Sequence, residues 1–96
     1  MVVGLLRMEL YLPAANSLKD KRQIVKSIIG KVESKYNVSI SEVGNHELWQ
    51  QVTIGIAHVS EKGKQTKKVL DHIDRYIENL DKAIVSERQV SMFSPE

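Results

Sequence analysis

The stretch Ser17-Leu-Lys-Asp-Lys-Arg-Gln-Ile-Val25 follows the first strand-like segment of the chain and opens its first helix. Its first residue has the side chain of an N-cap, and Asp20 stands where the acid of a capping box reaches back. The positive end of a helix dipole favours acidic neighbours, yet Lys19, Lys21 and Arg22 accompany this single acid. A local conflict of this kind is typical of a site that meets a specific partner.

Apolar residues return at the 3.6-residue period after this stretch, which predicts a helix to about Lys35 with Asn37 as a left-handed C-cap. Lys21 and Arg22 fall on the same stripe. We expect both to lie at the rim of the core, where an acid such as Glu42 holds them. The apolar stripe consists of Leu18, Val25, Ile28, Ile29, Val32 and Tyr36.

Four strand-like segments and a second helix complete the chain. Apolar and polar residues alternate along the strands, although less cleanly in the last one. The second helix starts at a cap, Ser60, and continues to about Leu80. The expected strands cover residues 2–12, 38–43, 48–59 and about 83–92.

The element order β-α-β-β-α-β predicts an α+β protein of the ferredoxin-like class, with a four-stranded antiparallel sheet and both helices on one face. Right-handed crossovers fix the strand order 4-1-3-2. We expect one domain over residues 1–96, with 93–96 as a loose tail. The helices then run antiparallel, so their two basic starts lie at opposite ends of the molecule.

Composition restricts the possible functions. Hydrophobic residues make up 42% of the chain and charged residues 27%, as in a folded globular domain. The chain has no cysteine, which excludes disulfides, thiolate metal sites and cysteine catalysis. It lacks a run of about 20 apolar residues, and charge comes too early for a signal peptide. We therefore expect a cytoplasmic protein without a membrane segment.

The start of the first helix is the first candidate site. The net charge of +2 is too small to indicate nucleic-acid binding by itself, but the charge is concentrated in this helix. Free backbone N–H groups, the helix dipole and basic side chains together favour phosphate of RNA, a nucleotide or an acidic protein segment. The alternative is that these cations are solvated or held in structural ion pairs. The candidate residues are Ser17, Lys19, Lys21, Arg22 and Lys26, of which Lys19 and Lys26 point outward.

The sheet face that no helix covers is the second candidate. RNA-recognition motifs stack bases on aromatic residues there, but the third strand lacks their basic-Gly-aromatic pattern. The other interpretation is that this face packs against a second copy of the chain, with or without a small ligand. We favour a homodimer over base stacking. The residues expected on this face are Leu5, Arg7, Tyr11, Trp49 and Thr53.

The sequence offers no catalytic constellation. His46, His58 and His72 lie in a turn, at a strand end and on a helix, without the spacing of metal ligands. Gly63-Lys64 precedes a threonine but lacks the upstream glycine of a phosphate loop. No serine is flanked by nucleophile-elbow glycines. We expect no catalytic residues, no metal and no cofactor, and hence a protein that is not an enzyme.

Four motifs carry a family resemblance: Ser17-Leu-Lys-Asp-Lys-Arg22, Ser41-Glu-Val43, Trp49-Gln50 and Ile54-Gly-Ile-Ala57. They resemble the YlxP-like family of small bacterial proteins with a ferredoxin-like fold, over nearly the whole chain. Its members often sit beside genes for translation initiation and ribosome maturation, including ribosome-binding factor A. The resemblance implies a role linked to the ribosome or RNA and carries no catalytic residues. We expect a non-catalytic module that binds RNA or the ribosome, with a homodimeric structural or regulatory domain as the alternative.

Overall fold

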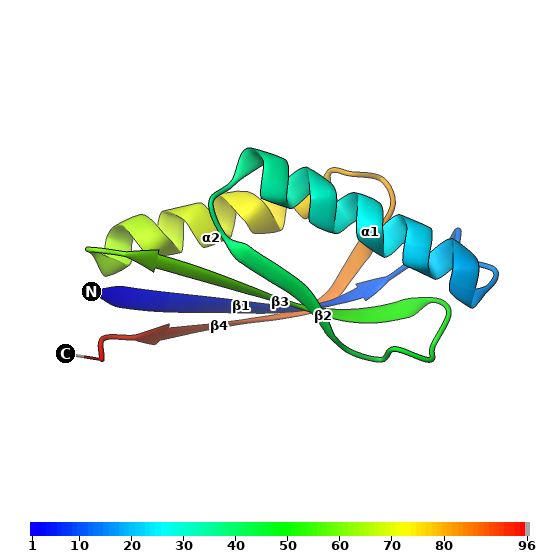
Figure 1. The fold of residues 1–96 in the computed structure, drawn as a ribbon, viewed down its shortest axis with the longest axis horizontal. Coiled ribbons are helices and arrows are strands. Elements are labelled where there is room, and N and C mark those ends of the chain that lie inside the picture. Colours follow the sequence, from blue (N-terminus) through cyan, green and yellow to red (C-terminus); the bar gives the residue numbers. More distant parts are fainter. Residues whose placement is uncertain (96) are drawn as a thin grey trace.

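The computed structural model describes residues 1–95, and the elements follow the order βαββαβ. The antiparallel sheet has the order β2-β3-β1-β4, which is the predicted order read from the other edge. Both helices lie on one face of this sheet (Figure 1). The predicted ferredoxin-like fold is confirmed. The bounds are Val2–Tyr11 (β1), Leu18–Lys35 (α1), Ser39–Gly44 (β2), Gln51–Ser60 (β3), Gly63–Glu78 (α2) and Ile84–Phe93 (β4).

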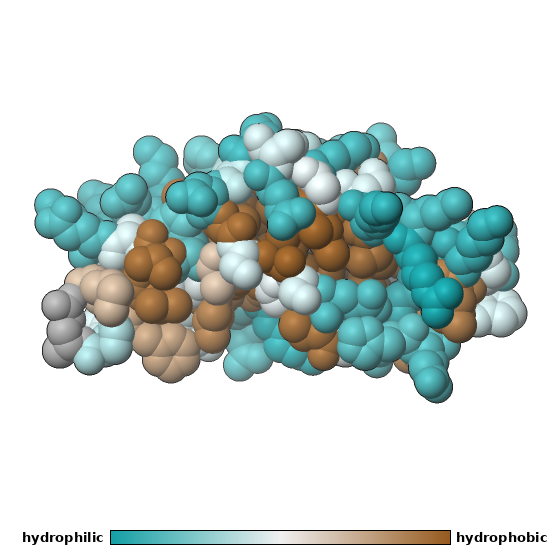
Figure 2. Space-filling model, viewed as in Figure 1, coloured by the Kyte–Doolittle hydropathy of each residue, from teal (hydrophilic) through white to brown (hydrophobic). Residues whose placement is uncertain are grey.

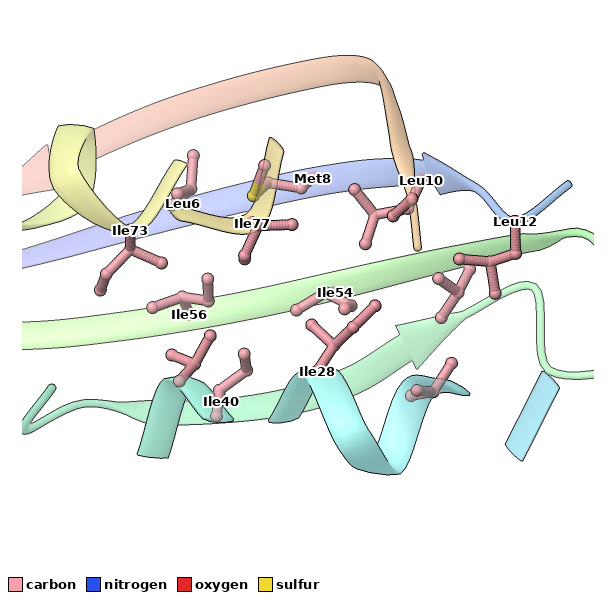
Figure 3. Close-up of a cluster of buried hydrophobic side chains, with 14 of the residues drawn as sticks. Leu6, Met8, Leu10, Leu12, Ile28, Ile40, Ile54, Ile56, Ile73 and Ile77 are labelled. Carbon is pink, nitrogen blue, oxygen red and sulfur yellow. The ribbon is translucent and has the colours of Figure 1, made fainter. Parts of the chain in front are cut away.

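The core lies between the helices and the sheet (Figure 3). Alternate residues of the two central strands form its floor, with Leu6 opposite Ile56 and Met8 opposite Ile54, all four buried. Burial of each such side chain contributes about 1.5–3 kcal/mol. The helices cover this floor with Val25, Ile28, Val32, Leu70, Ile73 and Ile77.

The first helix begins as the sequence predicts. The Asp20 backbone N–H donates to Ser17 Oγ at 3.0 Å, and the Asp20 carboxylate reaches back to accept from the Asn16 N–H at 3.1 Å, one residue before the N-cap N–H that a capping box uses. The predicted C-cap at Asn37 is wrong, because the cap is Tyr36 in an extended conformation, with φ −129°. Its ring packs edge-on against Tyr76 of α2, and β2 starts three residues later, so the chain extends at once.

The predicted cap of the second helix is also wrong. Ser60 is the last residue of β3, paired with Val2, and the N-cap is Lys62 without a side-chain hydrogen bond. Ser60 Oγ instead donates to the Lys62 carbonyl at 2.8 Å and contacts the buried Thr66 hydroxyl. His58 Nδ1 lies 3.0 Å from the same hydroxyl. These contacts satisfy a polar group inside the core, so Ser60 has a packing role in place of a capping one.

A bulge explains the irregular alternation of the last strand. The register between β1 and β4 shifts after Glu9, which leaves Ser86 as the extra residue. Ser86 Oγ donates to the Glu9 carbonyl at 3.1 Å. One extra residue reverses the alternation, so Val85 and Arg88 both face the helices although three positions separate them.

Candidate binding surfaces

Lys21 is held inside the protein. Its side chain is 2% exposed, its ammonium donates to the Asn45 carbonyl, and Nζ lies 3.3 Å from the Glu42 carboxylate. The predicted pairing with Glu42 is therefore confirmed. An ammonium with these partners is not free to bind a phosphate, so Lys21 has a structural role.

Arg22 lies elsewhere than predicted, because it is exposed and not at the rim of the core. Each residue of an α-helix turns by about 100°, so Arg22 sits about a quarter turn away from the line that faces the sheet. That line is formed by the buried residues Lys21, Val25, Ile28 and Val32.

Three of the predicted cations on α1 remain available. Lys19, Arg22 and Lys26 are exposed, and no acid among residues 1–95 pairs with them. They share the outward side of the helix over about 10 Å of its length. We call these three residues the basic stripe. The helix terminus itself is less suited to an anion than predicted, because Ser17 Oγ takes up the Asp20 N–H and the Asp20 carboxylate places a negative charge beside the first turn.

The loop between β2 and β3 differs most from the expectation. Trp49 lies in this loop and not in a strand, because pairing with β1 resumes only where the Leu12 N–H donates to the Gln50 carbonyl, at 2.8 Å. Asn45 turns the chain with φ 61°, in the left-handed region that asparagine tolerates. Its side chain donates to Thr53 Oγ1 at 3.0 Å, while its carbonyl accepts from Lys21. The loop is thereby tied to both α1 and β3.

Beside this loop is a hollow of about 510 Å³, which we call the end hollow. Trp49 is 55% exposed at its wall, and Leu48 is exposed as well. The loop beside it lies at the end of the molecule where α1 begins (Figure 1). Sequence reasoning missed it because it placed Trp49 in a strand. The lining residues are Tyr11, Glu47, Leu48, Trp49, Gln50 and Gln51.

The sheet face away from the helices is here called the open face. Leu5, Arg7 and Tyr11 are exposed there, as predicted from the alternation of β1. The prediction that Thr53 is exposed on this face is wrong. Thr53 is 3% exposed, because Gly44 and Asn45 pack over it. Sequence reasoning missed four exposed apolar residues that the strand register places on this face, namely Val43, Val59, Ile84 and Phe93.

Shape and charge vary along the open face. Gly55 and Ala57 leave a shallow trough of about 230 Å³ beside Leu5 and Val43. Further along β1, Arg7 Nη2 lies 3.1 Å from Glu9 Oε1. The exposed side of β1 thus reads Leu5, Arg7, Glu9, Tyr11, in the order apolar, basic, acidic, apolar.

Positive charge is concentrated on the helices. Ten of the fourteen Lys and Arg residues belong to α1 and α2, against five acids in the same helices. Hydrophilic side chains predominate along the helix-bearing side of the molecule in this view (Figure 2). Among the described residues, Arg7 is the one cation that the strands place on the open face, and it is paired. Phosphates are therefore attracted to the helix layer more than to the sheet.

The structure also limits other kinds of site. Within residues 1–95, no three His, Asp or Glu side chains gather closely enough to hold a metal ion. In the same range, no helix combines the length and apolar character that crossing a bilayer requires. His46 Nδ1 lies 3.3 Å from the Glu42 carboxylate, which is the group that also pairs with Lys21, but the His46 side chain is exposed.

The topology and these surfaces define a small ferredoxin-like domain with one uncovered sheet face. The chain belongs to the family described as "Protein of unknown function (DUF503)", whose profile matches residues 3–90. The uncharacterized protein YlxP of Bacillus subtilis (strain 168) is 40% identical over 78 residues, which cover 81% of this chain and 85% of the relative. The resemblance seen in the sequence motifs is confirmed.

Solved structures support the fold alone. A de novo designed protein with a ferredoxin fold superposes with a TM-score of 0.64 at 18% identity, covering 100% of this chain and 95% of the design. A second design, Foldit4, gives a TM-score of 0.51 at 20% identity, covering 99% and 98%. A fold shared with designed domains assigns no function, so function must be argued from the surfaces.

Proposed function

We propose that this protein is a non-catalytic binding module that pairs with a second copy through its open face. The observation that carries the proposal is the group of exposed apolar side chains on a face without a helix cover. Leu5 is 40% exposed there, and Val43, Val59 and Phe93 are exposed as well. Isolated apolar residues are normal on a protein surface, but a contiguous patch marks an interface.

The size of the face supports this proposal. Four strands about 4.8 Å apart and up to ten residues long give a face of about 19 Å by 30 Å, or roughly 600 Å² before side-chain relief. Stable interfaces bury about 800 Å² on each partner, so an interface of that size needs the whole open face. The partner must therefore be of similar size and flatness, as a second copy is.

The charge order on β1 favours a second copy as the occupant. Reversal of the order Leu5, Arg7, Glu9, Tyr11 places apolar residues against apolar ones and Arg7 against Glu9. A two-fold axis across β1 produces this reversal, because symmetric interfaces bring the same patch of both copies together. The trough beside Gly55 offers room for a side chain of the facing copy.

The test compares two matched lysine substitutions by light scattering over a dilution series. Leu5→Lys introduces a charge on the open face, whereas Val90→Lys changes a residue of similar exposure, 44%, on the helix side of β4. We expect wild type and Val90→Lys to dimerise and Leu5→Lys to remain monomeric at ten-fold higher concentration. A wild type that stays monomeric at high micromolar concentration contradicts the proposal.

The basic stripe supports a second function, binding of RNA or a ribosomal surface in the cytoplasm. Lys19, Arg22 and Lys26 are exposed, unpaired within residues 1–95 and on one side of α1, as backbone phosphates require. Face-to-face pairing of the sheets leaves both helix layers free, so the two functions are compatible. Ribosomal RNA is the first probe, because the family resemblance implies a link to the ribosome.

Salt dependence tests this second function. Each phosphate neutralised adds about 0.7–0.9 to the slope of log affinity against log salt. We expect Arg22→Ala/Lys26→Ala to lower the slope for structured ribosomal RNA by about 1–2. Lys64→Ala/Lys68→Ala removes two exposed cations from α2 and serves as the control. An equal loss in both variants indicates attraction to overall charge and argues against the basic stripe.

A further inference from the structure

The end hollow combines two aromatic side chains with one unpaired acid. Tyr11 and Trp49 stand in its lining, and Glu47 is the one charged residue among the six that form it. Glu47 is exposed and makes no ion pair within residues 1–95. Gln50 and Gln51 add amide oxygens that accept hydrogen bonds. The hollow therefore offers aromatic rings and hydrogen-bond acceptors to a ligand, with a formal charge of −1.

The hollow is supported by fixed parts of the fold. The Gln50 carbonyl accepts from Leu12, which joins one wall to the end of β1. Asn45 anchors the other end of the loop through Thr53 and Lys21. A loop tied at both ends loses less conformational freedom when a ligand binds, which favours a specific site over an incidental hollow.

We propose that the end hollow binds the guanidinium group of an arginine side chain presented by a partner protein. A guanidinium is planar, stacks on aromatic faces, and donates two parallel hydrogen bonds to a carboxylate. The faces of tryptophan and tyrosine attract such a cation, and the glutamine oxygens take up its remaining donors. The lining of the end hollow contains each of these groups: the aromatic rings, the carboxylate and the amide oxygens. A phosphate is repelled by Glu47, and a lysine ammonium lacks the planar face.

This inference goes beyond pairing of the sheets and beyond RNA binding. It rests on the loop between β2 and β3, and shares with the open face Tyr11 and its strand partner Gln51. The monomeric variant Leu5→Lys therefore separates the two proposals, because its hollow stays open whether or not the wild type dimerises.

Trp49 is the single tryptophan and reports binding by its fluorescence. The titration uses N-acetyl-arginine amide, its neutral isostere N-acetyl-citrulline amide, and guanosine monophosphate, against wild type and Leu5→Lys. We expect the Trp49 fluorescence to change and saturate on addition of the arginine amide, in both proteins. Half-saturation should need an arginine concentration at least ten-fold lower than the citrulline concentration. Similar responses to arginine and citrulline overturn the proposal. Tighter binding of the nucleotide also overturns it, and indicates a nucleobase site.

Charge-removing variants locate the contact. Glu47→Gln keeps the shape of the side chain and is expected to weaken arginine binding five-fold or more while leaving the citrulline response unchanged. Glu61→Gln removes another exposed acid, outside the lining of the hollow, and is expected to bind arginine as wild type does. Equal effects of both variants show attraction to overall charge and overturn the assignment to Glu47.

Discussion

The ammonium of Lys21 lies 3.3 Å from the Glu42 carboxylate and joins the first turn of α1 to the edge strand β2. The same ammonium donates to the Asn45 carbonyl, so it also holds the loop that follows this strand. Lys21 is almost fully buried, whereas its neighbours Lys19 and Arg22 are exposed. The basic start of α1 is therefore divided between one structural cation and others that face solvent.

Removal of the Lys21 ammonium should destabilise the fold. Lys21→Met keeps much of the side-chain volume but leaves Glu42 without its partner, so we expect a loss of about 2–4 kcal/mol in urea denaturation. The double variant Lys21→Met/Glu42→Gln should recover a large part of this loss, because no unpaired charge remains. Lys26→Met, at an exposed position, should change stability by less than about 0.5 kcal/mol. Equal stability of Lys21→Met and wild type contradicts a structural role.

Gly4 is expected to tolerate no side chain. A Cβ there lies 2.3 Å from the Thr66 methyl carbon and 3.0 Å from a Leu70 methyl carbon. Gly4→Ala should therefore cost about 1–3 kcal/mol by overpacking. Thr66→Ser removes the nearer methyl but keeps the hydroxyl, so Gly4→Ala/Thr66→Ser should be more stable than Gly4→Ala. Denaturation curves of the three variants check this, and an additive loss in the double variant refutes the steric explanation.

Gly30 offers the opposite expectation. Apart from the local backbone of the helix and the adjacent residues, no atom lies within 4 Å of a Cβ built at this position, which is exposed in the middle of α1. Gly30→Ala should stabilise the protein by about 0.5–1 kcal/mol, because alanine loses less backbone entropy in a helix. The midpoint of thermal or urea unfolding measures the gain. A lower midpoint indicates that the outer face of α1 is restricted at this point.

A charge exchange on the open face tests the register of the proposed dimer. Arg7→Glu places three acids together, since Glu9 already stands opposite Glu87, and should weaken dimerisation about ten-fold or more. The exchange Arg7→Glu/Glu9→Arg restores opposite charges in both the chain and the facing copy, so dimerisation should recover. Sedimentation equilibrium gives the dimer dissociation constants of both variants. Dimerisation lost in Leu5→Lys but unaffected in Arg7→Glu indicates a different register of the two faces.

Arg88 should be sensitive to replacement by lysine. Its Nε lies 2.6 Å from Asp74 Oδ2 and its Nη2 lies 3.1 Å from Oδ1, a two-point contact that joins β4 to α2. Lysine cannot form this contact, so Arg88→Lys should cost about 0.5–1 kcal/mol, a modest figure because the pair is partly solvated. Arg75→Lys, an exposed site without an ion pair in the described chain, is the matched control. Equal stability of the two variants would mean that the two-point contact of Arg88 with Asp74 contributes nothing to stability.

Periodicity and chain order were sufficient to predict the fold and part of the candidate sites. The N-cap at Ser17 and the pairing of Lys21 with Glu42 followed from the sequence. The N-cap depends only on residues within one turn of the helix. The Lys21 pair followed from the helix register, which pointed the side chain at the edge of the sheet.

The errors arose where contacts between distant residues decide the conformation. Arg22 was placed at the rim of the core because it falls at the edge of the apolar stripe, and only the docking angle of α1 turns it outward. Trp49 was placed in a strand because its apolar neighbours continue the alternation, whereas Asn45 and Lys21 hold that segment as a loop. Thr53 lies on the open face as predicted, but it is buried because the bulged end of β2 packs over its side chain. None of these features has a local signal.

The bulges have a consequence for how copies of the protein can assemble. Both outer strands are irregular, β4 at Ser86 and β2 between Glu42 and Gly44. An irregular edge is a poor template for adding a strand from another molecule. Growth of the sheet from copy to copy is therefore disfavoured in both directions, so the proposed association through the open faces would close at two copies and would not propagate into fibres.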